Sequence, residues 1–140
     1  SQFQVGNSGD GSVARANAWT TFSDRRWKTK IILITDALDK LHSINGYTYK
    51  WKEGADTSTQ VGVIAQEIEA VLPEAVKTDE NGYKSVDYGK LSALLIEAVK
   101  EQQTIITSLE NKIHEQNTTT IGIQSVQKSL DQRLLILEQK

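Results

Sequence analysis

Three patterns of apolar and polar residues follow one another along the chain, and each predicts a different kind of structure. The first 22 residues are rich in Gly, Ser, Asn and Thr and carry isolated apolar residues, a pattern typical of loops and short strands. From Ser23 to about Tyr88, short apolar runs alternate with turn residues. From Gly89 onward, apolar residues recur at helical spacing. We therefore expect a polar N-terminal piece, a small α+β unit and long C-terminal helices.

The first half of the middle region predicts a strand, a helix and a second strand. Ile31 to Ile34 is a short apolar run typical of a buried strand. Asp36 to Ile44 has apolar residues at helical spacing after a polar N-cap, and Asn45-Gly46 is expected to end that helix. Tyr47 to Lys52 alternates aromatic and polar residues, which indicates a strand with one aromatic face.

The second half of the middle region predicts a strand, a short helix and a hairpin. Val61 to Ala65 is the strand candidate, and Gln66 to Leu72 is a helix that stops before the only proline of the chain. Ala75 to Thr78 and Tyr83 to Val86 flank the sequence Asp-Glu-Asn-Gly, whose residues tolerate left-handed backbone. This arrangement predicts a β-hairpin.

The C-terminal region carries a heptad pattern. Steps of four and three residues from Leu95 to Leu137 visit thirteen positions, of which nine are apolar. A single exposed helix gains nothing from such a stripe, so the pattern predicts a coiled coil, and glutamines in the stripe are a known device for fixing register and strand number. We expect a coiled coil of three helices, one from each copy of the chain. The first six positions of this seam are Leu95, Val99, Gln102, Ile106, Leu109 and Ile113.

One stretch of this region disfavours helix. Asn117 to Gly122 contains three consecutive threonines, an isoleucine and a glycine. The heptad register passes through the stretch without slipping, so one continuous helix and an αα-hairpin both remain open.

Composition excludes several classes of function. The formal net charge of −2 and the pI near 5.7 do not favour nucleic acid as a partner. The chain has no cysteine, and its two histidines lack ligand spacing, so we expect no metal and no cofactor. The longest apolar run is far below a membrane span. The chain also lacks methionine, so we expect it to be a segment of a larger protein.

The chemical candidates are Ser23 and Lys28, five residues apart. A serine hydroxyl with an adjacent lysine can form a nucleophile and its general base. Residues five apart do not face each other on a regular helix or strand, so the pair requires a bend between them or a partner chain. A lysine at its reference pKa of about 10.4 stays protonated at neutral pH, so such a pair becomes active only when packing desolvates the amine. Taken alone, the two residues are a weak signal, and a helix cap at Ser23 with a surface charge at Lys28 is the more common arrangement.

Four motifs in one order resemble a known family. They are SDRRWK at Ser23 to Lys28, NGYTYKWK at Asn45 to Lys52, GVIAQEIEAVLPEAV at Gly62 to Val76, and DENGYKSVDYGKLSALLIEAVKE at Asp79 to Glu101. Together they resemble the C-terminal intramolecular chaperone domain of phage tail fibres, tailspikes and neck appendages, also called the S74 peptidase domain. The resemblance covers about residues 23 to 101.

The resemblance implies a function and a division of the chain. In that family the domain trimerises, helps the upstream β-rich fibre to fold, and then cuts itself off before the motif serine. Carried over, Ser23 is the nucleophile, Lys28 is the general base, and Phe22-Ser23 is the scissile bond. Residues 1–22 would then be the end of the fibre, 23–92 the α+β autoprotease core, and 93–140 the trimerisation helices.

Two positions depart from the family pattern. The family usually has asparagine where this chain has Lys30, and leucine where it has Trp27. We therefore expect impaired cleavage but intact trimerisation. Gln66 and Glu67 lie within the GVIAQE part of a family motif and, with Lys30, are candidate modulators of the reaction.

The resemblance also implies partners and a place of action. The chain would pair with itself as a homotrimer and act on the upstream fibre portion of the same polypeptide, with no nucleic acid and no membrane. It would work in the host cytoplasm during assembly, and the parent protein would reside in the virion. The alternative is a trimerisation and attachment module without proteolysis. A regulatory domain of a transcription factor is a third possibility, but the chain has no basic DNA-binding segment.

Overall fold

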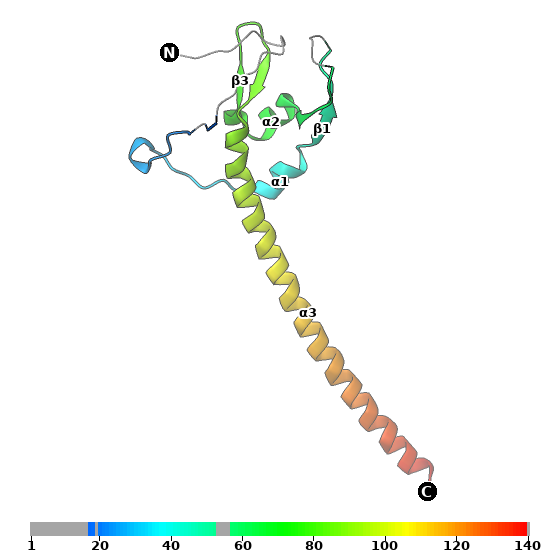
Figure 1. Cartoon of the computed structure of the whole chain (residues 1–140). Coiled ribbons are helices and arrows are strands. Elements are labelled where there is room, and N and C mark those ends of the chain that lie inside the picture. The colour runs from blue at the N-terminus through cyan, green and yellow to red at the C-terminus, as the bar shows by residue number, and fades with distance from the viewer. Residues whose placement is uncertain (1–16, 19, 53–56, 140) are drawn as a thin grey trace. The chain divides into compact units, whose positions relative to one another are not determined.

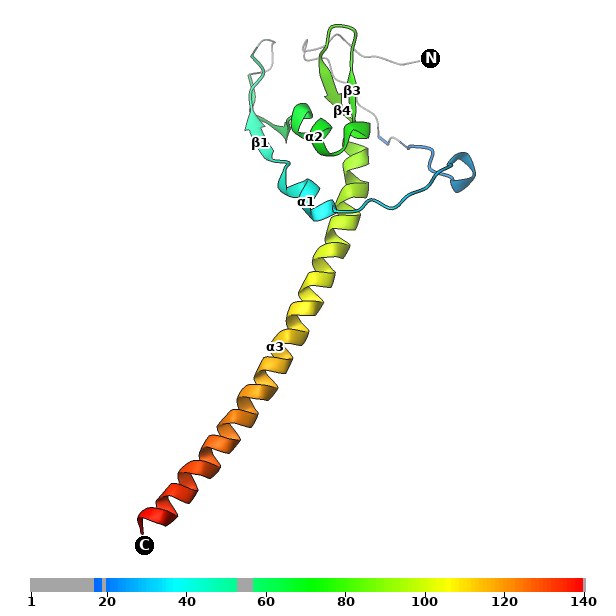
Figure 2. The same cartoon turned by 180° about the vertical axis from the view of Figure 1, so that it is seen from behind.

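The computed structural model describes residues 17–18, 20–52 and 57–139, which form two compact units, Ser1–Ala98 and Val99–Lys140. The first unit mixes short helices and β-hairpins, and a long helix occupies the C-terminal part of the chain (Figures 1 and 2). The expected combination of an α+β region with C-terminal helix is confirmed at this level. The elements are the 3-10 turn η1 Arg25–Trp27, α1 Ala37–His42, β1 Gly46–Tyr49, β2 Gln60–Val63, α2 Ala65–Val71, the 3-10 turn η2 Pro73–Ala75, β3 Val76–Thr78, β4 Lys84–Val86 and α3 Tyr88–Glu138.

The four strands form two separate antiparallel hairpins. β1 pairs with β2 so that Gly46 lies opposite Val63, and β3 pairs with β4 so that Val76 lies opposite Val86. Two-stranded sheets have little stability alone, so each hairpin needs support from a neighbouring element. That support comes from α2, which lies between the hairpins in the order of the chain and contacts the second one.

The turn of the second hairpin follows from its residues. The Asp79 carboxylate accepts hydrogen bonds from the backbone N–H groups of Asn81 at 2.9 Å and Tyr83 at 2.8 Å. Gly82 has a φ of 85°, a conformation that glycine adopts without steric cost. The predicted hairpin is confirmed, with strands that start and end within one residue of expectation.

The core of the first unit is small and is built around the start of α3. Ala37 of α1 packs with Leu94 and Ala98 of α3, and all three are almost fully buried. Five partly buried apolar side chains complete the cluster: Ile34, Leu38, Leu41, Ile44 and Leu72. α2 buries its own Ile68 completely. These contacts hold α1 against the first turns of α3.

The two short helices match the predicted positions with shifted ends. α1 ends at His42 rather than Ile44, because the N–H groups of Ser43 and Ile44 bond to Lys40 and Leu41 and tighten the last turn. Gly46, expected to help end that helix, instead opens β1. α2 begins one residue before the predicted start and stops at Val71, ahead of Pro73 as expected.

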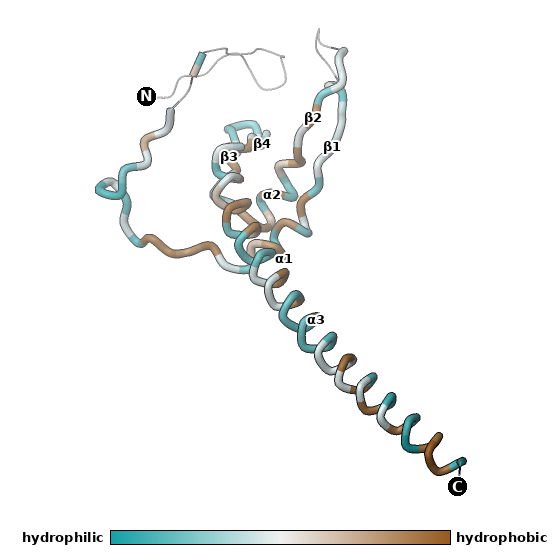
Figure 3. Tube along the Cα trace, turned by 60° about the horizontal axis from the view of Figure 1, so that its bottom comes forward, coloured by the Kyte–Doolittle hydropathy of each residue, from teal (hydrophilic) through white to brown (hydrophobic). Residues whose placement is uncertain are grey.

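The predicted strand at Ile31 to Ile34 is wrong. This segment joins neither hairpin, and its neighbours Lys30 and Asp36 have left-handed φ values of 50° and 54°. Ile34 packs against the core, whereas Ile31, Ile32 and Leu33 are exposed. An apolar run supplies the composition of a strand, but a strand also needs a partner to pair its backbone groups. The segment is an irregular hydrophobic stretch of chain that leads into α1 (Figure 3).

The long helix settles the alternative that the sequence leaves open. α3 continues through Asn117 to Gly122 without a break, which excludes the αα-hairpin. The Thr118 and Thr119 hydroxyls each donate a 3.0 Å hydrogen bond to the carbonyl four residues earlier, so the polar groups of these β-branched residues are satisfied within the helix. A helix of 51 residues is about 76 Å long.

Candidate functional site

Ser23 and Lys28 contact each other directly. The Lys28 Nζ atom donates a hydrogen bond of 2.7 Å to the Ser23 Oγ atom. Both side chains are exposed. The structure therefore brings together the two residues that sequence reasoning singles out as nucleophile and base, at a distance over which a proton can pass between them.

The bend between the two residues is the 3-10 turn η1. The N–H of Trp27 bonds to the Asp24 carbonyl at 3.1 Å, and the N–H of Lys28 bonds to the Arg25 carbonyl at 3.0 Å. A 3-10 turn advances the chain by about 2 Å per residue, so its two ends stay close. This turn provides the bend that the five-residue spacing requires.

Asp24 and Arg26 form an ion pair at the start of the turn. The Asp24 carboxylate caps η1 by accepting from the backbone N–H of Arg26 at 2.8 Å, and it also accepts from the Arg26 guanidinium through Nε at 3.1 Å and Nη2 at 2.7 Å. Hydrogen bonds from Arg26 hold the pKa of the Asp24 carboxyl below its usual range, and the pKa of Arg26 is raised in return. Sequence reasoning missed this pair, although an aspartate that caps a turn is a recognisable signal.

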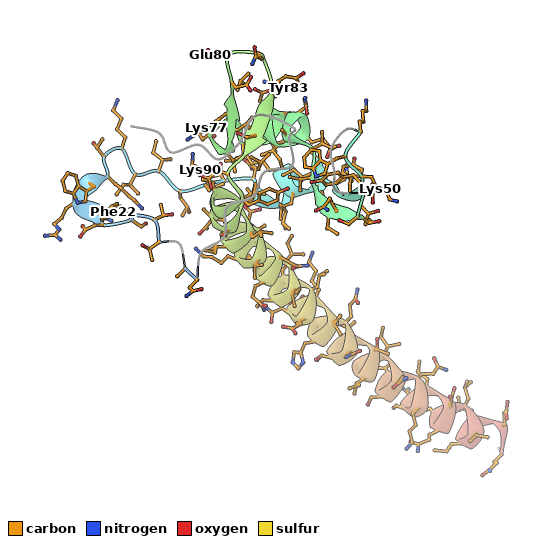
Figure 4. All side chains as sticks on the ribbon, turned by 45° about the horizontal axis from the view of Figure 1, so that its top comes forward. Phe22, Lys50, Lys77, Glu80, Tyr83 and Lys90 are labelled. Atoms are coloured by element: carbon orange, nitrogen blue, oxygen red, sulfur yellow. The ribbon has the colours of Figure 1, made fainter. Side chains whose placement is uncertain are left out.

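The bond before Ser23 lies at the surface. The side chain of Phe22 is 98% exposed, and Figure 4 shows it on the loop that carries η1. Trp27, at the end of the turn, is 85% exposed. Lys30, two residues after Lys28, has left-handed backbone. Asparagine and glycine adopt this conformation more readily than lysine does. The backbone conformation at position 30 therefore favours those residues, in addition to any effect of the side chain.

Glu67 forms hydrogen bonds to the first hairpin. Its Oε1 atom accepts a 2.6 Å hydrogen bond from the Tyr47 hydroxyl, and its Oε2 atom accepts from the backbone N–H of Asn45 at 3.0 Å. The Tyr47 hydrogen bond, followed by that from Asn45, lowers the pKa of Glu67, and the same contact raises the pKa of Tyr47. Gln66 is exposed on the first turn of α2. Asn45, Tyr47 and Glu67 all lie in motifs that carry the family resemblance, but the motifs do not indicate which of their residues meet.

The seam residues of α3 are exposed along their length. In the first unit Leu95 is 49% exposed, although its neighbour Leu94 is fully buried in the core. Within the second unit, apolar seam residues stay between 40% and 62% exposed: Val99, Ile106, Leu109 and Ile113. Gln102 is exposed as well. Hydrophobic and hydrophilic positions alternate along the helix (Figure 3). The helix thus presents an apolar stripe that its own chain does not cover.

The described residues show neither a membrane-spanning helix nor a metal-binding cluster. No helix among them is long and apolar enough to cross a membrane. No group of three or more His, Asp or Glu side chains in the described ranges is placed to hold a metal ion.

The comparisons with known proteins match the predicted resemblance. Residues 23–77 match the family model Peptidase S74, described as the chaperone of endosialidase, and the match begins at Ser23. The chain is 35% identical over 104 residues to the long tail fiber protein Gp37 of Escherichia phage AR1, and 38% identical over 98 residues to that of Enterobacteria phage K3. These alignments cover 64% and 65% of this chain but only 9% and 8% of the relatives. The resemblance to the S74 chaperone family is confirmed.

Proposed function

We propose that the chain, whose residues 23–77 match the S74 chaperone family, is a trimeric intramolecular chaperone of a phage tail fibre that releases itself by cutting Phe22-Ser23. The observation that carries the proposal is the family match that opens at Ser23, together with the 2.7 Å contact between Ser23 and Lys28. The tail fibre relatives support a role in fibre assembly and a place for the parent protein in the virion.

The chaperone activity rests on effective concentration. Long β-rich fibre chains must register against each other over distant contacts, which is slow and exposes them to aggregation. Three copies joined through the exposed α3 seam make the remaining pairing intramolecular. The apolar seam from Leu95 to Ile113 supplies the surface for that association.

The cutting step uses the two residues of the turn. The neutral Lys28 amine takes the proton of the Ser23 hydroxyl, and Oγ attacks the carbonyl carbon of Phe22. The C–N bond of Phe22-Ser23 then breaks, and the amide nitrogen of Ser23 leaves as an amine after it receives the proton. Water hydrolyses the resulting ester, which yields a carboxylate on Phe22 and restores the Ser23 hydroxyl. Proximity favours the first step because nucleophile and target belong to adjacent residues.

Exposure of the Ser23 and Lys28 pair explains how assembly would control the cut. A lysine acts as a base only in its neutral form, and loss of solvent favours that form. In the single chain both side chains lie at the surface. Association of three copies would cover them, so the cut would follow assembly rather than precede it.

Intact-mass measurement of the purified chain tests the cleavage. Incubation should yield fragments of residues 1–22 and 23–140, whereas Ser23→Ala and Lys28→Met should remain one chain. Cleavage in H₂¹⁸O should place ¹⁸O on the Phe22 carboxylate, and hydroxylamine should trap the ester as a hydroxamate at Phe22. A chain that trimerises without any of these products, both with Lys30 and with Lys30→Asn, would instead be the non-proteolytic trimerisation module. Cleavage of Ser23→Ala at the same bond would refute the assignment of the nucleophile.

A further inference from the structure

The loop around the Ser23 and Lys28 pair carries an unusual density of exposed apolar side chains. Within residues 22–33, five large apolar side chains are between 56% and 98% exposed: Phe22, Trp27, Ile31, Ile32 and Leu33. Large apolar side chains exposed at this density along one short segment are typical of a surface that meets a partner. Within this loop, the residues from Ile31 onward have the composition of a β-strand, but they pair with neither hairpin of their own chain.

The charge of this loop is opposite to that of the remainder of the first unit. Residues 22–33 carry four cations and one carboxylate, a formal net charge of +3. Residues 34–98 carry six lysines and eleven carboxylates, a formal net charge of −5 with His42 neutral. The C-terminal residues 99–140 carry five charges of each sign and are neutral overall. A basic, apolar loop and an acidic body are therefore parts of one unit, and complementary charge favours contact between them.

We propose that the loop of residues 22–33 docks on residues 34–98 of a second copy of the chain. The proposal rests on the trimer proposed above. A loop that leaves its own body and binds the next copy makes a head-to-tail contact, and three such contacts close into a ring. The views in Figures 1 and 2 agree that the loop runs away from the hairpins of its own chain. Docking covers Ile32 and Trp27 and, between them, Lys28.

Single-cysteine labelling in the assembled chain tests the docking. The chain contains no cysteine, so each introduced thiol is the only one present. Ser23→Ala serves as the background so that the loop stays attached. Ile32→Cys reports on the loop, because Ile32 is 84% exposed in the single chain. Asn111→Cys is the matched control, because Asn111 is exposed on α3, lies outside residues 34–98 and is not a seam position.

The docking predicts a specific pattern of maleimide labelling rates. In protein that sediments as a trimer, Ile32→Cys should react at least about tenfold more slowly than Asn111→Cys, because burial removes the thiol from the reagent. Adding Ile106→Asp to break the seam should equalise the two rates. High salt should also raise the Ile32→Cys rate, because it screens the charge attraction.

The outcomes separate this proposal from the proposed function. Equal rates for the two thiols in a sedimenting trimer overturn the docking and leave the trimer intact. Slow labelling of Ile32→Cys in the monomeric Ile106→Asp protein also overturns it, since the cover would then come from the same chain. If the protein without Ile106→Asp sediments as a single copy, both proposals are overturned.

Discussion

The Tyr47 hydroxyl donates a 2.6 Å hydrogen bond to the Glu67 carboxylate, which ties the first hairpin to α2. Two residues further along α2, Glu69 accepts a 2.7 Å hydrogen bond from Lys84 of the second hairpin. The residue between them, Ile68, is fully buried. A helix of seven residues thus anchors two hairpins that have little stability alone.

The Glu67 contact predicts a pH dependence of stability. The folded-state pKa of Glu67 lies below its ordinary value of 4.5, so its contribution is present above about pH 4.5 and is lost as the pH falls through the folded pKa. Glu67→Gln should lower the free energy of unfolding at pH 7 and flatten its fall in acid. Urea denaturation between pH 3 and pH 7 measures both. Glu80→Gln, which makes the same charge change at the exposed hairpin tip, should leave the acid slope unchanged, and an unchanged slope in Glu67→Gln would contradict the prediction.

The close approach of Tyr88 to β2 predicts that Gly62 tolerates no side chain. A Cβ atom at Gly62 would lie 2.7 Å from the Tyr88 hydroxyl and 3.3 Å from Cε1 of Tyr49. Gly62→Ala should therefore destabilise the fold by about 1–3 kcal/mol, because Tyr88 must move and release the 3.3 Å hydrogen bond from Val63 N–H.

A double-mutant cycle checks the origin of that cost. Tyr88→Phe removes the oxygen atom that the new Cβ would meet. In this background Gly62→Ala should cost at least about 0.5 kcal/mol less, as expected for groups in contact. Additive effects in thermal or urea unfolding would show that the Tyr88 hydroxyl is not the obstacle.

The left-handed backbone at Lys30 predicts which substitutions help the chain. The φ of 50° costs a residue with a Cβ atom about 1–2 kcal/mol, and asparagine bears it more readily. Lys30→Asn should raise the extent of cleavage on a denaturing gel. Lys30→Gly should do so too if the backbone is the cause, and Lys30→Ala should match the parent chain. Improvement with asparagine alone would assign the effect to the side-chain amide, and an unchanged band in every variant would show that Lys30 does not limit cleavage.

The seam on α3 predicts a sharp difference between two isoleucines. Ile106 belongs to the heptad stripe and Ile121 does not, although both are exposed in the single chain. Ile106→Asp would place a charge in the centre of the proposed coiled coil and should convert a trimer into single copies at micromolar concentration. Ile121→Asp is the control and should leave the trimer intact. Sedimentation velocity distinguishes the two, and equal behaviour would contradict the assigned register.

Local patterns in the sequence were sufficient for the elements that depend on local chemistry. The Asp79 to Gly82 turn and the stop of α2 before Pro73 could be predicted because turn and proline geometry act within a few residues. The Ile31 to Ile34 strand was wrong because its apolar composition does not say whether a pairing partner exists. The contacts of Glu67 could not be predicted, since its partners lie 20 and 22 residues away. The bend between Ser23 and Lys28 was anticipated as a requirement but not as a 3-10 turn that begins with an ion pair between Asp24 and Arg26.

The dependence of self-cleavage on chain concentration shows whether assembly activates the Ser23 and Lys28 pair. Intact mass should be followed over time at concentrations above and below the assembly midpoint found by sedimentation. We expect the 23–140 fragment to appear only where trimers form, and Ile106→Asp to stay uncut at every concentration. Equal cleavage of single copies and trimers would contradict the claim that assembly activates the Ser23 and Lys28 pair.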